Sequence, residues 1–200
     1  MKRLLLLLVL ATLTLTAACG SDDDPAVSSG GDSGAAHNDA DVEFAQNMIP
    51  HHTQAVEMAK MALEKSPDPD VKDLAGRIVK AQGPEIEKLT GWLEDWDEPV
   101  EGGAKSGMGG MGGNEMMSDE DMAGLEKATA ADFDKMFLEM MIKHHKSAIK
   151  MAGVELEDGK FADAKALAQE IIDAQEAEIT EMEEMLEGSS GSMGSTTTAP

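Results

Sequence analysis

The chain repeats itself at one fixed spacing, and this duplication limits its possible folds more than any other feature. Residues 93 positions apart are alike over two long segments of the 200-residue sequence. The matched pairs include Phe44 with Phe137, Met48 with Met141, His51 with His144, His52 with His145, Met58 with Met151, Gln82 with Gln175, and Glu85 with Glu178. A single unchanged offset indicates two copies of one structural unit.

Each copy is predicted to form two long helices, because apolar residues recur at helical spacing and strand signals are scarce. The expected helices span about 39–65, 70–96, 130–156 and 160–187, with a short helix after Ser118. Two helical hairpins of the same design would pack as a four-helix bundle over residues 39–187. The sequence therefore predicts an all-α fold.

The paired histidines replace apolar residues on the inner faces of the first and third long helices. His51 interrupts the apolar stripe at positions 44, 48, 55, 58 and 62, and His52 interrupts its neighbour; His144 and His145 repeat this pattern. Adjacent residues lie about 100° apart around a helix axis, so the two rings of a pair cannot point at one spot. Both rings are nevertheless expected to face the interior.

Glu85 and Glu178 interrupt the apolar stripes of the second and fourth helices. Burying a carboxylate without a partner costs several kcal/mol, so we expect both to meet the histidines near the bundle centre. Two interpretations follow: a metal centre, or a polar network in which the histidines donate to Glu and Gln and bind nothing. The symmetric placement favours the metal centre.

Methionines near the histidines favour a soft metal. Met48, Met58, Met141 and Met151 lie one or two turns from the histidine pairs. Thioethers with imidazoles suit Cu(I), and they suit Cu(II) when a carboxylate or water completes the set; iron or manganese would need more carboxylates. Taken singly, each of these methionines could equally be core filler.

A Met/Gly-rich segment at 102–117 joins the two copies. It places Met108, Met111, Met116 and Met117 among glycines, where we expect no core. The segment is predicted to be either a secondary soft-metal site or a low-complexity hinge.

The two ends of the chain are predicted to lie outside the bundle. Residues 1–18 read as a signal peptide, and Cys19 stands where a bacterial lipoprotein is cleaved and lipidated. Residues 19–38 would form a lipidated tether and 188–200 a flexible tail. Loss of Lys2 and Arg3 takes the formal charge from −23 to −25. Such an acidic chain is not expected to bind nucleic acid, and its membrane link would be the lipid anchor on the extracytoplasmic face.

The doubled Met-Ile-x-His-His motif and the later Gln-x-x-Glu-Ile resemble the domain-of-unknown-function family numbered 305 over about residues 39–187. That resemblance implies a ferritin-like fold, export from a bacterial cell, and copper binding or resistance as known for some members. It also implies His51, His52, His144 and His145, with Met48 and Met141, as candidate ligands.

The two half-sites are not expected to be identical, because Pro50 precedes the first histidine pair and Gly83-Pro84 interrupts the second helix. Three functions remain open. The leading one is a copper-binding protein that sequesters or passes on the metal, with no evident nucleophile. The others are a ferritin-like two-metal oxidase and a metal-free bundle that is structural or binds a partner.

Overall fold

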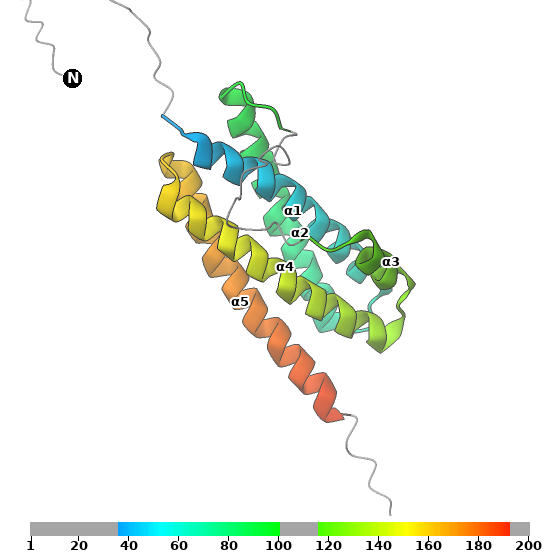
Figure 1. The fold of residues 1–200 in the computed structure, drawn as a ribbon. Helices are drawn as coiled ribbons and strands as arrows, with labels where there is room; N and C mark the ends of the chain where they lie inside the picture. The colour runs from blue at the N-terminus through cyan, green and yellow to red at the C-terminus, as the bar shows by residue number, and fades with distance from the viewer. Residues whose placement is uncertain (1–35, 101–115, 193–200) are drawn as a thin grey trace, which may run out of the picture. The chain divides into compact units, whose positions relative to one another are not determined.

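In the computed structural model, the described residues, 36–100 and 116–192, fold into helices and contain no strand (Figure 1). The helices are α1 Asp39–Lys65, α2 Pro69–Asp95, α3 Asp119–Lys127, α4 Ala130–Asp158 and α5 Ala162–Ser192. The predicted all-α architecture and its four long helices are confirmed. None of these helices is long and apolar enough to span a membrane.

Local capping explains where the first helices begin and end. Asn38 and Asp41 form a capping box at the start of α1, and Ser118 and Asp121 form another at the start of α3. Such boxes satisfy backbone N–H groups that have no partner in the first turn. Ser66 ends α1, and α2 starts at Pro69, a position where a missing N–H costs nothing.

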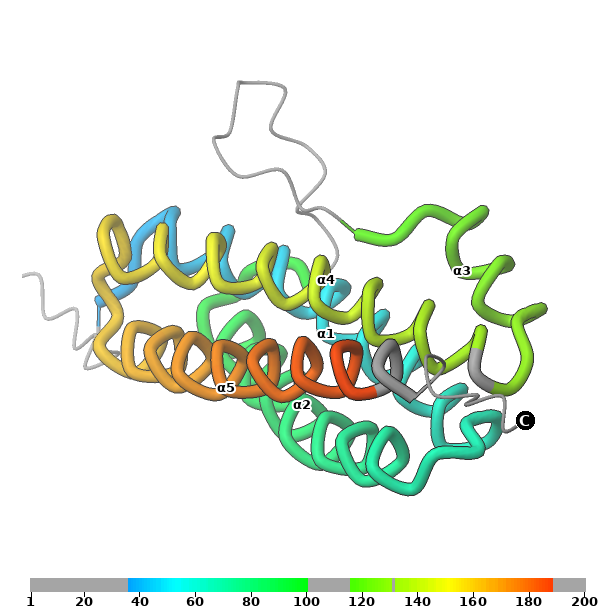
Figure 2. The backbone as a smooth tube through the Cα atoms, turned by 90° about the horizontal axis from the view of Figure 1, so that it is seen from below, coloured from blue at the N-terminus to red at the C-terminus, as the bar shows by residue number. Residues whose placement is uncertain are grey.

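The helices form two hairpins that meet mainly through their first members. In one hairpin α1 packs against α2, in the other α4 packs against α5, and α1 contacts α4 between them (Figure 2). The short helix α3 leads into α4 and contacts it. This arrangement puts both histidine-bearing helices, α1 and α4, at the interface of the two repeats.

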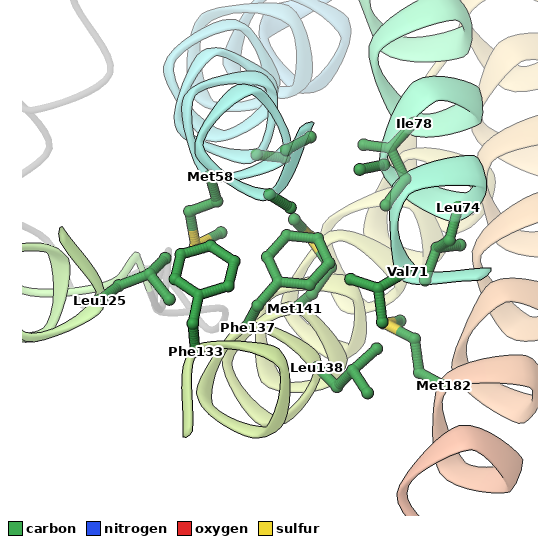
Figure 3. Packing of buried hydrophobic residues seen from close by; sticks show 14 of the residues in the cluster. Met58, Val71, Leu74, Ile78, Leu125, Phe133, Phe137, Leu138, Met141 and Met182 are labelled. Carbon is green, nitrogen blue, oxygen red and sulfur yellow. The ribbon is translucent and has the colours of Figure 1, made fainter. Parts of the chain in front are cut away.

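The core consists of two apolar clusters. One contains Met58, Phe133, Phe137 and Met141 (Figure 3), and the other contains Phe44, Met48, Leu89, Met151 and Ile171. Each long helix contributes to both clusters. Between its two contributions each helix carries a pair of polar residues: His51 and His52 on α1, Gln82 and Glu85 on α2, His144 and His145 on α4, Gln175 and Glu178 on α5. A polar layer therefore crosses the middle of the bundle.

Two details differ from the sequence prediction. Helix α5 continues to Ser192, past the expected end at Glu187, because an existing helix gains one backbone hydrogen bond for each residue it adds. Met117 was expected in a segment without a core, but it is buried and belongs to the first cluster. The expected signal peptide, Cys19, most of the tether and the end of the tail, like Met108 and Met111, lie outside the described residues.

Candidate metal centre

The four paired histidines are buried where the two repeats meet. His51, His52 and His145 are 0% exposed and His144 is 1% exposed. The ring centroids of His51 and His144 are 3.6 Å apart, so these two rings touch across the interface between α1 and α4. We call the four residues the histidine layer. The remaining described histidine, His37, lies elsewhere and stacks on Trp96.

Each repeat also places a carboxylate on its second histidine. Nε2 of His52 lies 2.8 Å from Oε2 of Glu85, and Nε2 of His145 lies 2.8 Å from Oε2 of Glu178. The predicted meeting of both glutamates with the histidines is therefore confirmed. The two contacts differ in alignment, because only the His145 contact has hydrogen-bond geometry.

The layer leaves many polar atoms without a partner. Within the described residues, neither ring nitrogen of His51 has a hydrogen-bond partner, and Nε2 of His144 and Nδ1 of His145 also have none. The side-chain oxygens of Gln82 and Gln175, in the same layer, are unpartnered as well. An unmade hydrogen bond at a buried polar atom costs about 1–3 kcal/mol. Buried donors and acceptors without a partner are therefore concentrated in the histidine layer.

Burial keeps the central histidines neutral. Desolvation, with smaller contributions from the nearby histidines, lowers the pKa of His51 to about 3 and the pKa of His144 to about 2. Both rings therefore carry a free nitrogen lone pair at neutral pH. Since metals bind neutral imidazole, no proton has to leave these two rings before they coordinate an ion.

The predicted methionine ligands border the histidine layer in two pairs. Met48 and Met151 belong to one apolar cluster, and Met58 and Met141 belong to the other. Each pair joins one residue of α1 to one of α4, so thioethers from both repeats stand on each side of the layer. Met48, Met58 and Met141 are fully buried and Met151 is nearly so.

Of the predicted loop methionines, Met116 is half-buried and Met117 is held by a residue that sequence reasoning missed. The side-chain amide of Gln54 donates to the carbonyl of Met117 at 2.9 Å and accepts from its N–H at 2.8 Å. A glutamine on a helix carries no sequence signal of a partner more than sixty residues away.

As it stands, the layer is not a closed coordination shell. Among the described residues, no group of three or more His, Cys, Asp or Glu side chains is arranged to hold a metal ion. The rings of His51 and His144 contact each other within this layer.

Comparison with known proteins places the chain in a family. Residues 41–186 match the family described as Domain of unknown function (DUF305). A curated relative, uncharacterized protein L153 of Acanthamoeba polyphaga mimivirus, is 34% identical over 55 residues, which span 28% of this chain and 36% of that protein.

Solved structures resemble most of the chain. A DUF305 protein from Streptomyces coelicolor, described as secreted, has a TM-score of 0.70 and 30% identity over 74% of this chain and 93% of that one. CopM in its Cu(I)-bound form has a TM-score of 0.63 and 31% identity, and in its Cu(II)-bound form 0.64 and 34%; both cover 74% of this chain and 96% of CopM. The chain belongs to the DUF305 family.

Proposed function

We propose that this protein is an extracytoplasmic copper-binding protein whose histidine layer, with the flanking thioethers, holds the metal. The unpartnered ring nitrogens of His51 and His144 carry the proposal. These neutral nitrogens and the four flanking methionines form the soft donor set that Cu(I) prefers. The copper-bound and silver-bound forms of the similar protein CopM support the same chemistry.

The donor set fits copper better than a hard metal. Glu85 and Glu178 are the carboxylates of the layer, and each already lies against a histidine. A carboxylate-rich iron or manganese site would need more oxygen donors than this layer provides. His51, His52, His144 and His145 would hold copper, with thioethers from one or both methionine pairs. We therefore propose sequestration or delivery of copper as the role of this layer.

The test is an anaerobic Cu(I) titration against a chromophoric chelator, with the apo-protein melting temperature measured in parallel. In the test variant all four layer histidines become Leu; the control is His37→Ala, outside the layer. We expect the Leu variant to lose the Cu(I) ion that binds at the histidine layer, and the control to keep it. The melting temperature of the apo Leu variant reports the sum of two effects: fewer unpaired ring nitrogens, and the loss of the histidine partners of Glu85 and Glu178.

The opposite pattern would support the metal-free network. If the parent does not compete for Cu(I), and the Leu variant unfolds at a much lower temperature, the histidines hold the bundle together without a metal. Binding of a saturating metal should instead raise the parent's stability by about 2.7 kcal/mol at a hundredfold excess over Kd.

The proposed location is a lipid anchor at Cys19 after removal of residues 1–18. The sequence pattern supports the lipid anchor, and the similarity to a protein described as secreted supports the extracytoplasmic location. Detergent-phase partitioning of cell extracts tests it. We expect the parent in the detergent phase and the Cys19→Ala variant in the aqueous phase. Equal partitioning of the two proteins would contradict the proposed lipid anchor.

A further inference from the structure

A groove between α1 and α3 carries a second set of soft donors, away from the histidine layer. It has a volume of about 450 Å³ and is lined by Glu57 and Met61 of α1 and by Asp119, Met122, Ala123 and Glu126 of α3. Met61 and Met122 are half-buried, with part of each side chain packed on the first apolar cluster. Their remaining surface faces the groove and solvent.

The groove has fixed walls. Gln54 holds Met117 by two hydrogen bonds, which secures the chain just before α3 to α1. At the other end of α3, the Lys65 ammonium donates to the carbonyl of Glu126. Leu125, on the inner side of α3, is fully buried in the first cluster. Three separate contacts therefore fix α3 on this side of the bundle, with Met122 of α3 and Met61 of α1 lining the same groove.

We propose that this groove is a second, surface site for Cu(I), with the thioethers of Met61 and Met122 as its ligands. Two thioethers are soft donors that favour a monovalent soft ion over Ca²⁺, Mg²⁺ or Zn²⁺. The carboxylates of Glu57, Asp119 and Glu126 are not arranged to hold an ion by themselves. They instead create a negative potential that raises the local concentration of cations at the thioethers.

The duplication provides an internal comparison. The residue equivalent to Met61 in the second repeat is Val154, and the equivalent of Glu57 is Lys150. Helix α3 lies between the two repeats, so the second repeat has no copy of its methionine or its carboxylates. The groove is thus a single-copy feature, whereas every element of the histidine layer occurs twice. The proposal does not depend on the histidine layer, and the two sites can be removed separately.

The experiment uses the whole protein with ¹³C-methyl methionine and adds Ag(I), a diamagnetic stand-in for Cu(I), followed by anaerobic Cu(I) titration. We expect the methyl signals of Met61 and Met122 to shift with added Ag(I). The double variant Met61→Leu, Met122→Leu should bind one of its Cu(I) ions at least tenfold more weakly than the parent. Its melting temperature should stay nearly unchanged, because Leu and Met have similar volumes. Met185→Leu, at a half-buried methionine of the same cluster, is the matched control.

Two further measurements separate this site from its alternatives. The variant with all four layer histidines changed to Leu should keep the Ag(I)-dependent shifts of Met61 and Met122. Glu57→Gln with Glu126→Gln should weaken binding less than the methionine variant, with a smaller dependence on salt. Shifts confined to other methionines, or an unchanged Cu(I) affinity in the double Leu variant, would overturn the proposal.

Discussion

The centre of the bundle and its two ends preserve the duplication to different degrees. At the centre, both repeats place a glutamate 2.8 Å from a buried histidine. At the ends, the equivalent residues Asp41 and Asp134 have different surroundings. Oδ1 of Asp41 accepts from the N–H groups of Lys160 and Phe161, whereas Oδ1 of Asp134 is buried with no hydrogen-bond partner among the described residues.

One proline accounts for much of this difference. Asp41 binds the turn between α4 and α5, and Asp134 faces the turn between α1 and α2. In that second turn Pro67 takes the place of Lys160, so one of the two N–H donors is missing. The N–H of Asp68, which would be the other donor, bonds to the hydroxyl of Ser66 instead.

The pKa values of the two aspartates follow from these contacts. Burial raises the pKa of Asp134, and the hydrogen bond from Ser66 offsets this only in part. Burial also acts to raise the pKa of Asp41, but the N–H groups of Phe161 and Asn38, with smaller contributions from Glu155 and the N–H of Lys160, outweigh burial and lower it. Turn residues can therefore diverge separately in each repeat. The centre is more constrained, because His51 and His144 contact each other and a change in one repeat alters the other.

The largest difference between the two ends should appear when the aspartates are removed. Asp41→Ala leaves the N–H groups of Asn38, Lys160 and Phe161 without their acceptor, and we expect a loss of about 3 kcal/mol in the free energy of unfolding. Asp134→Ala removes a carboxylate that lacks such donors and should change stability by less than about 1 kcal/mol. Urea unfolding of both variants measures this. Equal losses would mean that the two ends are equivalent.

A second asymmetry concerns Glu155, whose equivalent in the first repeat is Ala62. Glu155 is 1% exposed, and its carboxyl lies so close to Gly159 that an added Cβ there would come within 2.1 Å of Oε1. Burial, together with the hydrogen bond and the charge of Asp41, raises the pKa of Glu155 to about 8. The raised pKa favours the protonated, neutral form of the Glu155 carboxyl at pH 7.

This raised pKa predicts a pH dependence with a definite sign. Between the ordinary value of 4.5 and about 8, the folded state holds a proton on Glu155 that the unfolded state has lost. Stability should therefore fall by several kcal/mol as pH rises across this window, and level off above it. Glu155→Gln keeps a hydrogen-bond donor without a titrating group. Urea midpoints between pH 5 and pH 9 should decline in the parent and stay nearly level in the variant; parallel declines would contradict this assignment.

Local and periodic features could be predicted from the sequence, whereas contacts between distant segments could not. The bounds of α1 match the prediction because Asn38, Ser66 and Pro67 act on their immediate neighbours. The histidine layer was predictable because apolar residues recur at helical spacing along each long helix, and this spacing identifies the face that points into the bundle. The bonds of Asp41 to Lys160 and Phe161, and of Gln54 to Met117, join distant parts of the chain and leave no periodic signal. Met61 and Met122 were missed for the same reason, since only the packing of α3 brings them to one groove.

The smallest expected effect concerns the second helix of each repeat. Gly83-Pro84 in α2 corresponds to Glu176-Ala177 in α5, yet α2 continues through both residues. A Cβ added at Gly83 would meet nothing within 4 Å, so Gly83→Ala should stabilise the protein by about 0.5–1 kcal/mol through helix propensity alone. Glu176→Gly, at the matching place in α5, should destabilise it by a similar amount.

Thermal unfolding of these two variants decides how the repeats differ at this position. Opposite shifts of similar size would mean that the second helices differ there only in local propensity, while the layer around Glu85 and Glu178 stays equivalent. If Gly83→Ala destabilises the protein instead, the glycine is needed for the backbone path next to Pro84.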